Sequence, residues 1–353
     1  MTRFSELDTP AVLIDIDRVE ANLQRAQDYA DGHGLKLRPH IKTHKLPRFA
    51  RRAMELGAVG ITVQKLGEAE VMADAGITEI FLPYNILGDA KLARLRALSE
   101  RIHITVTADS AETVAGLSVT FADAIGPLTV LVECDTGMGR CGVQSPADAV
   151  TLAQLIAASP GLEFGGLMTY PAAGQVETNA AWLAAARDAL MAAGLPPAII
   201  SNGGTPDLWR AHEVTAATEH RPGTYIYMDR FQVAKGVGGY QDCALTVLAT
   251  VVSRPTENRA IIDAGSKALT SDTLGLTGFG LIEAYPGAEI IGLSEEHGTI
   301  DLSNCANKPA IGEQLRIIPN HACVVSNLFD TVTLISGDAV VETVRVDARG
   351  RVG

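Results

Sequence analysis

The chain has 353 residues, 47% of them hydrophobic and 20% charged, which is long enough for two domains or for one barrel with an appendage. Its formal net charge of -12 argues against nucleic acid and anionic membranes as partners, because both are bound by basic patches. No run of about 18 apolar residues is present to span a bilayer. The five cysteines are scattered, and residues 1–8 lack the basic and apolar regions of a signal peptide, so we expect a reduced, cytoplasmic protein.

From about residue 10 to about residue 235, short apolar runs alternate with amphipathic stretches such as Asp17–Gly32 and Thr178–Ala193. About eight repeats of a strand followed by a helix predict a (β/α)8 TIM-type barrel. The strand candidates are Ala11–Ile14, Gly60–Val63, Glu79–Leu82, Ile102–Val106, Thr129–Glu133, Phe164–Met168 and Ala198–Ser201.

From about residue 240 the rhythm changes to short β-rich runs separated by turns. This pattern predicts a mostly antiparallel β domain, and Gly236–Gly239 is the natural hinge before it. We therefore expect a barrel domain at 1–238 and a C-terminal β domain at 239–353. The expected strands of the second domain are Ala244–Ser253, Arg259–Asp263, Glu289–Leu293, Gln314–Ile318, Thr331–Ile335 and Val340–Val346.

A basic segment, Arg-Pro-His-Ile-Lys-Thr-His-Lys at residues 38–45, follows the short stretch Gly34–Leu37. It is placed where a first barrel strand would deliver its carboxyl end. A lysine at that rim can form a Schiff base with a carbonyl cofactor. Taken alone, the segment could also be a solvated basic turn, since lysines usually point at water.

Glycine-rich segments follow two of the apolar runs. Glu133–Gly142 allows the backbone to approach a ligand closely, and Arg140 within it offers several donors to an anionic oxygen. Ser201–Pro206 precedes a predicted helix, where free N–H groups and the helix dipole favour a phosphate. Arg221–Tyr225 could supply further backbone donors. A phosphate site built from the last two loops of a barrel is a recurrent arrangement.

In the β domain, Pro319–Cys323 places His321 and Cys323 two residues apart. On a strand this spacing would put both side chains on one face. An imidazole and a thiolate together favour zinc over magnesium or calcium. The alternative is a partly buried histidine beside an inert core cysteine.

These four segments, Arg-Pro-His-Ile-Lys-Thr-His-Lys at 38–45, Asp-Thr-Gly-Met-Gly-Arg-Cys-Gly at 135–142, Arg-Pro-Gly-Thr-Tyr at 221–225 and Pro-Asn-His-Ala-Cys at 319–323, resemble one family in order and over nearly the whole chain. The chain is similar to the alanine-racemase-like (fold type III) pyridoxal-phosphate enzymes. Within them it resembles the branch of the D-threonine aldolases and D-serine dehydratases. The resemblance implies an alanine-racemase-type barrel followed by a β domain that carries metal ligands.

The resemblance also assigns roles to residues. Lys42 would hold pyridoxal 5'-phosphate as a Schiff base, Arg140 would lie near its phenolic oxygen, and Arg221 would face its pyridine nitrogen. A cation facing that nitrogen would weaken the electron sink. His321 and Cys323 would bind a catalytic divalent metal, with zinc favoured by the cysteine and manganese or magnesium as alternatives. The implied catalytic residues are Lys42, His321 and Cys323, and the implied cofactor-binding residues are Lys42, Arg140, Tyr170, Ser201, Gly203, Gly204, Thr205, Arg221, Gly223, Thr224 and Tyr225.

The activity that the resemblance implies is a lyase acting on D-3-hydroxy amino acids. The main prediction is a D-threonine aldolase, which cleaves its substrate to glycine and an aldehyde. The alternative is a dehydratase of D-serine or 3-hydroxy-D-aspartate, yielding a keto acid and ammonia, toward which Cys323 points. A racemase would need a second base and would leave the His-Ala-Cys motif without a purpose. Non-catalytic pyridoxal-phosphate-binding barrels lack the second domain. A homodimer with the active site at the subunit interface is the implied assembly.

Overall fold

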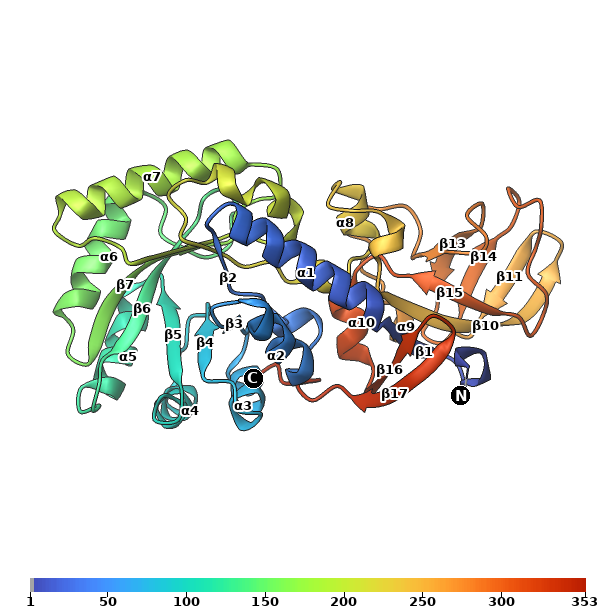
Figure 1. Ribbon diagram of the computed structural model, residues 1–353, viewed down its shortest axis with the longest axis horizontal. Coiled ribbons are helices and arrows are strands. Elements are labelled where there is room, and N and C mark those ends of the chain that lie inside the picture. Colours follow the sequence, from blue (N-terminus) through green and yellow to red (C-terminus); the bar gives the residue numbers. More distant parts are fainter. Residues whose placement is uncertain (1–2) are drawn as a thin grey trace. The chain divides into compact units, whose positions relative to one another are not determined.

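The computed structural model describes residues 3–353, which form two compact units (Figure 1). We call one the barrel unit; it comprises Arg25–Lys42, Leu46–Gly223 and Arg351–Gly353. The other, the sheet unit, comprises the described chain up to Gln24, together with Thr43–Lys45 and Thr224–Gly350.

The barrel unit is built on eight parallel strands in the order β2-β9-β8-β7-β6-β5-β4-β3. A parallel bridge between His40 and Thr62 joins the two ends of this order and closes the barrel. The expected TIM-type barrel is thereby confirmed. Its strands are β2 (Lys36–Leu37), β3 (Ile61–Thr62), β4 (Glu79–Leu82), β5 (His103–Ala108), β6 (Leu128–Cys134), β7 (Leu162–Thr169), β8 (Ile199–Asn202) and β9 (Glu219–His220).

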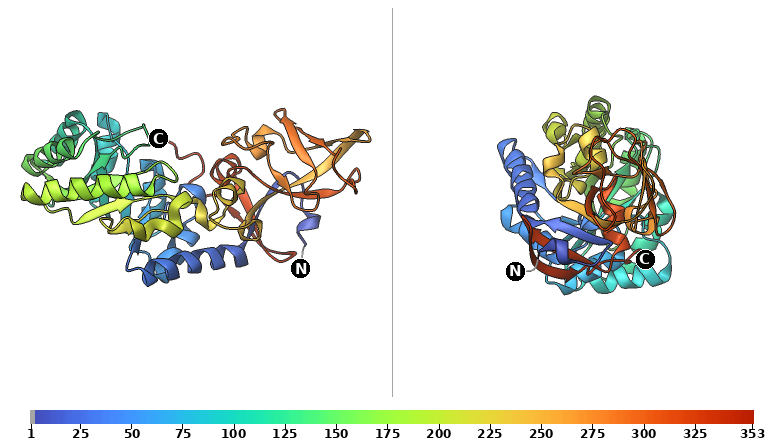
Figure 2. Two further views of the ribbon diagram at one scale, coloured as in Figure 1. Left: turned by 90° about the horizontal axis from the view of Figure 1, so that it is seen from above. Right: turned by 90° about the vertical axis from the view of Figure 1, so that its right-hand side faces the viewer.

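The helices of the barrel unit lie on the outer side of its strands (Figures 1 and 2). Serine side chains cap two of them: Ser110 accepts from Thr113 N before α5, and Ser145 accepts from Asp148 N before α6. The helical segments are α2 (Pro47–Leu56), α3 (Leu66–Asp74), α4 (Asp89–Ser99), α5 (Ala111–Phe121), α6 (Pro146–Ala158), α7 (Val176–Ala192) and η3 (Thr205–Glu213), with α1 (Ile16–Gly32) and η2 (Ile41–Thr43) shared between the units.

Apolar packing holds the barrel strands in place. Phe81, Leu131 and Met168 form a buried cluster from three strands, and Ile199 of a fourth packs against it. Because parallel strands are covered on both faces, such strands are apolar along most of their length. The carboxyl ends of these fixed strands carry the loops that contain the predicted site residues.

The sheet unit contains a nine-stranded sheet with the main order β13-β14-β11-β10-β1-β16-β17, while β15 pairs with β10 and β12. Among the described strands of this unit, only β1 and β16 pair in parallel, so the predicted mostly antiparallel domain is confirmed. Its strands are β1 (Ala11–Asp15), β10 (Leu245–Thr256), β11 (Arg259–Ile262), β12 (Leu281–Ile282), β13 (Glu289–Leu293), β14 (Gly298–Asp301), β15 (Gln314–Ile318), β16 (Thr331–Ser336) and β17 (Ala339–Arg345). Its helical segments are η1 (Phe4–Glu6), η4 (Thr224–Ile226), α8 (Arg230–Ala234), η5 (Tyr240–Asp242), α9 (Ser266–Leu269) and α10 (Ala322–Leu328).

The assignment of Ala11–Ile14 to the barrel is wrong. These residues form β1, which pairs with β10 and β16 of the sheet unit. A buried apolar run looks the same in a barrel and in a mixed sheet, so its pattern does not identify its partners. The first barrel strand along the chain is instead β2, whose two residues are too few to produce a periodic signal.

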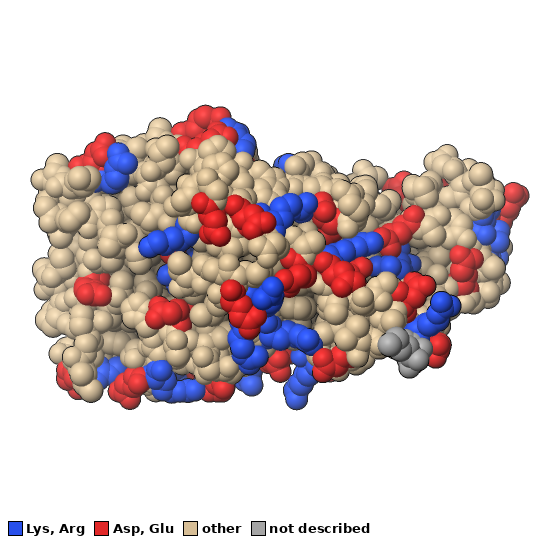
Figure 3. Space-filling model, viewed as in Figure 1, with Lys and Arg blue, Asp and Glu red and all other residues tan. Residues whose placement is uncertain are grey.

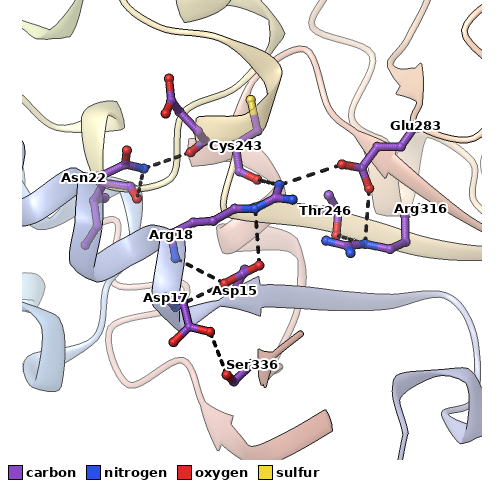
Figure 4. A network of polar contacts seen from close by, with 11 residues as sticks. Asp15, Asp17, Arg18, Asn22, Cys243, Thr246, Glu283, Arg316 and Ser336 are labelled. Carbon is purple, nitrogen blue, oxygen red and sulfur yellow. Dashed lines mark hydrogen bonds and ion pairs between the residues drawn. The ribbon is translucent and has the colours of Figure 1, made fainter. Parts of the chain in front are cut away.

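Polar contacts tie the start of α1 to the rest of the sheet unit (Figure 4). Arg18 forms an ion pair of 3.3 Å with Asp15 and donates to the carbonyl of Cys243 at 2.7 Å. Asn22 donates to the carbonyl of Asp242 at 2.9 Å. These contacts associate the first part of the chain with residues beyond 224. The domain boundary expected at residues 238 and 239 stays a prediction.

Charged side chains of both signs are interspersed among other residues at the surface. On the face drawn in Figure 3, Lys and Arg side chains lie among Asp and Glu side chains. Within residues 3–353, no helix combines the length and the apolar character that crossing a membrane requires.

Candidate active site

Lys42 lies in the short helical turn η2, just after β2 in the barrel unit. Its Nζ is 5.8 Å from the centre of the Tyr170 ring, and Tyr170 directly follows β7. The backbone N–H of Lys42 donates to His40 Nδ1 at 3.3 Å. The Nε2 of His40 therefore carries the proton and donates to Gln64 Oε1 at 3.1 Å. His40 thus links the turn that presents Lys42 to the loop after β3.

Arg140 reaches the same aromatic ring from the loop after β6. Its guanidinium carbon is 5.2 Å from the centre of the Tyr170 ring. The loop is shaped by Asp135, whose Oδ1 accepts from the N–H groups of Gly137 and Gly139, each at 3.0 Å. The structure therefore brings Lys42, Arg140 and Tyr170 together, as the sequence predicts for a cofactor site.

The loops after β8 and β9 meet beside this ring. A Cβ on Gly204 would be 2.9 Å from Tyr170 Cε2, so the loop backbone and the ring are in close contact. The backbone N–H of Gly223 donates to Thr205 Oγ1 at 3.1 Å. Gly203 has a φ of +94°, a left-handed conformation that favours glycine. These loops are the predicted phosphate cradle.

Arg221 is buried, and its guanidinium is held by β7 and β8. It donates to Ser201 Oγ at 2.6 Å and to the carbonyl of Thr169 at 2.7 Å. Ser201 donates in turn to Glu219, which forms an ion pair of 2.9 Å with Arg38. Burial lowers the pKa of Arg221 to about 10, although the Glu219 carboxylate opposes this shift. Arg221 is therefore a cation at neutral pH, fixed in direction by its neighbours.

Glu133, at the end of β6, is a site residue that the sequence analysis did not assign. Burial, assisted by the negative charge of Asp109, raises the pKa of Glu133 to about 7, while Arg140 and Arg221 oppose the shift. A carboxyl close to both arginines can thus gain or lose a proton near neutral pH. The sequence feature that could have identified Glu133 is an acidic residue at the end of an otherwise apolar strand.

The donor set of the barrel unit fits pyridoxal phosphate. It offers an amine for the aldehyde, one guanidinium group beside an aromatic ring, a second one fixed by buried hydrogen bonds, and a glycine- and threonine-rich loop pair for the phosphate. The predicted residues brought together here are Lys42, Arg140, Tyr170, Ser201, Gly203, Gly204, Thr205, Arg221 and Gly223.

The other two predicted cofactor residues, Thr224 and Tyr225, belong to the sheet unit. Thr224 Oγ1 lies 3.6 Å from Cys323 Sγ. Burial raises the pKa of Tyr225, whose phenol therefore stays protonated. Their roles toward the cofactor stay predictions.

His321 and Cys323 are adjacent in the sheet unit, but they do not lie on a strand as expected. His321 is the N-cap of α10, with an extended φ of -139°, and Cys323 lies in the first turn of this helix. The three-residue motif carries no periodic signal that distinguishes a strand from the start of a helix. Burial alone would lower the pKa of His321, but the charges of Cys323 and Asp229 raise it to about 10.

Asp229 is the residue that orients His321, and the sequence analysis did not identify it. Its fully buried carboxylate accepts from His321 Nδ1 at 2.9 Å and from the Ala322 N–H at 3.0 Å through the same oxygen. Its other oxygen accepts from Gln232 N at 2.9 Å and caps α8. Nδ1 is thereby used, so Nε2 is the nitrogen of His321 that can bind a metal.

The sulfur of Cys323 is contacted by two hydroxyls. Thr43 Oγ1 lies 3.1 Å from Sγ, and Thr224 Oγ1 lies 3.6 Å from it. An imidazole nitrogen and a sulfur are a donor pair that fits zinc. Within residues 3–353, no group of three or more His, Cys, Asp and Glu side chains is placed to hold a metal. A metal bound by the pair would therefore keep positions open for water or substrate.

Comparison with known proteins identifies the family. The alanine racemase N-terminal domain matches residues 14–231, and the putative serine dehydratase domain matches residues 244–335. The chain belongs to the family of the alanine racemase N-terminal domain. The membership expected from the four sequence motifs is confirmed.

Two curated relatives align with nearly the whole of this chain. The D-threonine aldolase of Arthrobacter sp. is 35% identical and aligns with 98% of this chain and 94% of its own length. The D-threo-3-hydroxyaspartate dehydratase of Delftia sp. (strain HT23) is 32% identical, with 96% of each chain aligned. The family therefore contains both reaction types.

Solved structures agree with this membership. The D-threonine aldolase from Filomicrobium marinum superposes with a TM-score of 0.90 at 34% identity, covering 99% of this chain and 98% of the other. A mutant of D-threo-3-hydroxyaspartate dehydratase in its metal-free form has a TM-score of 0.88 at 30% identity, covering 98% and 99%. The alanine racemase of Clostridium difficile 630, at 15% identity and a TM-score of 0.73 over 97% and 100%, shares the fold.

Proposed function

We propose that the chain is a pyridoxal-phosphate- and metal-dependent lyase that cleaves D-3-hydroxy amino acids, with D-threonine giving glycine and acetaldehyde. The observation that carries this proposal is the convergence of Lys42 and Arg140 on Tyr170 at the carboxyl ends of the barrel strands. The likeness to the Arthrobacter and Filomicrobium D-threonine aldolases supports the choice of reaction.

In this proposal each barrel residue has a task. Pyridoxal phosphate, when bound, withdraws electrons from the substrate carbon that carries the amino group. Lys42 Nζ holds the cofactor's aldehyde carbon and, once the substrate amine replaces it, is an amine able to move a proton. Arg140 would lie near the cofactor's phenolic oxygen, and Arg221 would face its ring nitrogen. Gly203–Thr205 would hold the phosphate through backbone N–H groups and the Thr205 hydroxyl, whose oxygen accepts from Gly223 N.

The sheet unit contributes a metal site in this proposal. His321 Nε2 and Cys323 Sγ would hold a divalent metal, for which the sulfur makes zinc the first choice. Bound there, the metal would supply a Lewis acid that lowers the pKa of a hydroxyl group. Asp229 fixes the direction of the His321 ring, because its carboxylate accepts from Nδ1.

A dehydratase is the second candidate, and Cys323 favours it. The metal-ligand pair includes a thiol, and a D-threo-3-hydroxyaspartate dehydratase aligns with 96% of the chain. In this reaction Lys42 would take the proton from the α-carbon and the β-hydroxyl would leave. The released enamine would then hydrolyse to a keto acid and ammonia.

Product analysis with D-threonine tests both candidates. Purified holoenzyme is incubated with D-threonine and, as the control, with L-threonine. Glycine and acetaldehyde in equal amounts from the D-isomer are expected from the aldolase, while 2-oxobutyrate and ammonia would establish the dehydratase. No product from D-threonine, D-serine or D-3-hydroxyaspartate, in a preparation that binds pyridoxal phosphate, would contradict the proposed lyase.

A cytoplasmic location and a homodimer complete the proposal. Light scattering coupled to size-exclusion chromatography measures the mass of the assembly, against 37.2 kDa for one chain. A mass of one chain would contradict the homodimer, and cell fractionation tests the location.

A further inference from the structure

A cavity in the barrel unit lies against Gly203, on the loop that we assign to the cofactor phosphate. Polar side chains from α7, from the ends of β8 and β9, and from η3 are among those that line it. Its lining includes Asn179, Asn202, Gly203, Val214 and His220.

His220 holds the backbone of both loop glycines. It is 2% exposed, and its Nε2 lies 3.1 Å from the carbonyl oxygen of Gly204. A Cβ on Gly203 would be 1.9 Å from His220 Cε1, so the ring packs directly against the Gly203 backbone. The ring therefore sets where the loop runs and which way the Gly203–Gly204 segment faces.

The hydrogen bond to Gly204 determines the tautomer of His220. A carbonyl oxygen can only accept, so Nε2 carries the proton and Nδ1 presents a lone pair. Burial, together with the charge of Arg221, lowers the pKa of His220 to about 4, which keeps the ring neutral at physiological pH. Within residues 3–353, His220 Nδ1 is buried and has no hydrogen-bond partner.

Asn179, which lines the same cavity, carries a second buried acceptor. It is 1% exposed, and its Nδ2 donates to Asn202 Oδ1 at 2.9 Å. Its Oδ1 likewise has no hydrogen-bond partner within the described chain. Two buried acceptors on residues that line the same cavity call for a ligand that brings two hydrogens, because buried polar groups are almost always paired.

We propose that the cavity binds one ordered water molecule, which donates to His220 Nδ1 and Asn179 Oδ1, and that the His220 ring it supports positions the phosphate loop. This inference rests on the proposed function, in which Gly203–Thr205 binds the cofactor phosphate. His220 acts through the loop backbone and is a positioning residue.

The role of His220 is tested by comparing pyridoxal phosphate with pyridoxal, which lacks the phosphate. Reconstitution of the full-length protein with each compound, followed by absorbance, measures both dissociation constants. We expect H220F to weaken pyridoxal phosphate binding about tenfold, the scale of one lost hydrogen bond, and to leave pyridoxal binding unchanged.

Two conservative variants separate the hydrogen bond from packing. In H220Q the amide nitrogen lies near the former Nε2 and can donate to Gly204, so binding should stay within about threefold of wild type. In H220N the amide is too short to reach the carbonyl, so binding should fall as in H220F. V214A alters the same cavity without touching a polar atom and is the matched control, with unchanged binding expected.

Several outcomes would overturn the role of His220. Equal pyridoxal phosphate affinity in wild type and H220N would do so, as would an equal loss for pyridoxal and pyridoxal phosphate in H220F. If H220F fails to fold, the H220Q and H220N pair decides. If wild type binds pyridoxal phosphate with the expected preference over pyridoxal, the proposed cofactor function stands even when His220 proves neutral. Failure of wild type to bind the cofactor would overturn both.

A crystal structure of the holoenzyme tests the water. We expect one peak within hydrogen-bond distance of His220 Nδ1 and Asn179 Oδ1, and its loss in N179L. An empty cavity would overturn this assignment. An ammonium ion in place of the water would also overturn it. Such an ion would be revealed by a change in the affinity for pyridoxal phosphate in ammonium chloride that sodium chloride at the same concentration does not produce.

Discussion

The barrel unit and the sheet unit present their candidate residues in different ways. In the barrel unit, each residue follows a separate strand: Lys42 comes after β2, Arg140 after β6 and Tyr170 after β7. In the sheet unit, both proposed metal ligands come from one short segment at the start of α10. The residues of the barrel site are therefore held by several separate strands, and the two proposed metal ligands by one short segment.

This difference predicts how each site responds to change. A barrel loop is anchored by a buried strand of its own, so a substitution in one loop leaves its neighbours in place. His321 instead depends on Asp229, a carboxylate 92 residues away in the chain. We therefore expect the cofactor site to lose function mainly through its reacting groups, with smaller losses from positioning residues such as His220, and the metal site to lose function through its supporting groups to a comparable extent.

The largest effect is expected from Lys42→Ala. Loss of the amine should remove the lysine-bound cofactor and lower kcat/KM for D-threonine by roughly 10³-fold or more, because no other group can replace it as covalent anchor and base. Borohydride reduction and peptide mapping measure the label at residue 42. Lys36→Ala, at an exposed lysine of β2, is the control and should retain both label and activity. A label at another lysine would break the proposed barrel site.

Metal removal should disable the proposed metal site and leave the cofactor site intact. Thorough chelation of the holoenzyme should lower activity roughly 10²-fold and leave the cofactor's absorbance intact, because the two groups have different ligands. Zinc or manganese should restore turnover. Cys323→Ala should reproduce the chelated state, whereas Cys305→Ala, at a partly exposed cysteine of the same unit, should behave as wild type. Full activity after chelation would contradict the assignment of His321 and Cys323.

The barrel part of the comparison was largely predictable from sequence. Strand β4 occurs at the residues expected, and α1 and α7 match the predicted amphipathic segments closely. The glycine-rich loops were recognisable because each directly follows an apolar run. Sequence position and spatial position agree wherever a buried strand ends in a short loop.

The supporting contacts were not predictable. Nothing local in the sequence links Asp229 to His321 or Thr43 to Cys323, since these contacts depend on how distant segments pack. The partners of β1 and the start of α10 at His321 were missed for the same reason: short segments carry no periodicity that identifies their neighbours.

The pH dependence of the unfolding free energy tests the protonation state of Glu133 in the barrel unit. The pKa of Glu133 is raised from 4.5 in the unfolded chain to about 7 in the fold, mainly by burial. The protonated carboxyl therefore stabilises the fold fully below pH 4.5, and this contribution is lost as pH rises through 7. Glu133→Gln cannot ionise, so between pH 5 and pH 8 it should lose less unfolding free energy than wild type. The difference should be up to about 3 kcal/mol, at about 1.4 kcal/mol per pKa unit.

Denaturant unfolding of the cofactor-free protein at both pH values measures this difference without a contribution from ligand binding. Glu112→Gln, at an exposed position of α5, is the control and should follow the wild-type pH dependence. A parallel pH dependence of Glu133→Gln and wild type would show that Glu133 is ionised throughout this range, and that the arginines outweigh its burial.

Asp229→Asn tests the dependence of the metal site on one supporting carboxylate. The variant keeps the size of the side chain, and its amide oxygen can still accept from Gln232 N to cap α8. Its amide nitrogen, if turned toward His321, would donate to Nδ1 and leave the proton on Nε2, the nitrogen proposed to bind metal. Metal affinity should fall about 10- to 100-fold, the usual cost of losing such a partner, while the cofactor's absorbance stays unchanged.

Competition with a chromophoric chelator measures that affinity. Asp242→Asn is the matched control: its carboxylate accepts from Gly239 N in the same unit, without a histidine. An equal loss in both variants would assign the effect to general destabilisation of the sheet unit. A loss confined to Asp229→Asn would show that the metal site depends on a residue outside the motif that supplies its ligands. The two sites would then differ in where their supports lie: Asp135 shapes the Arg140 loop from within that loop, whereas Asp229 supports His321 from 92 residues away.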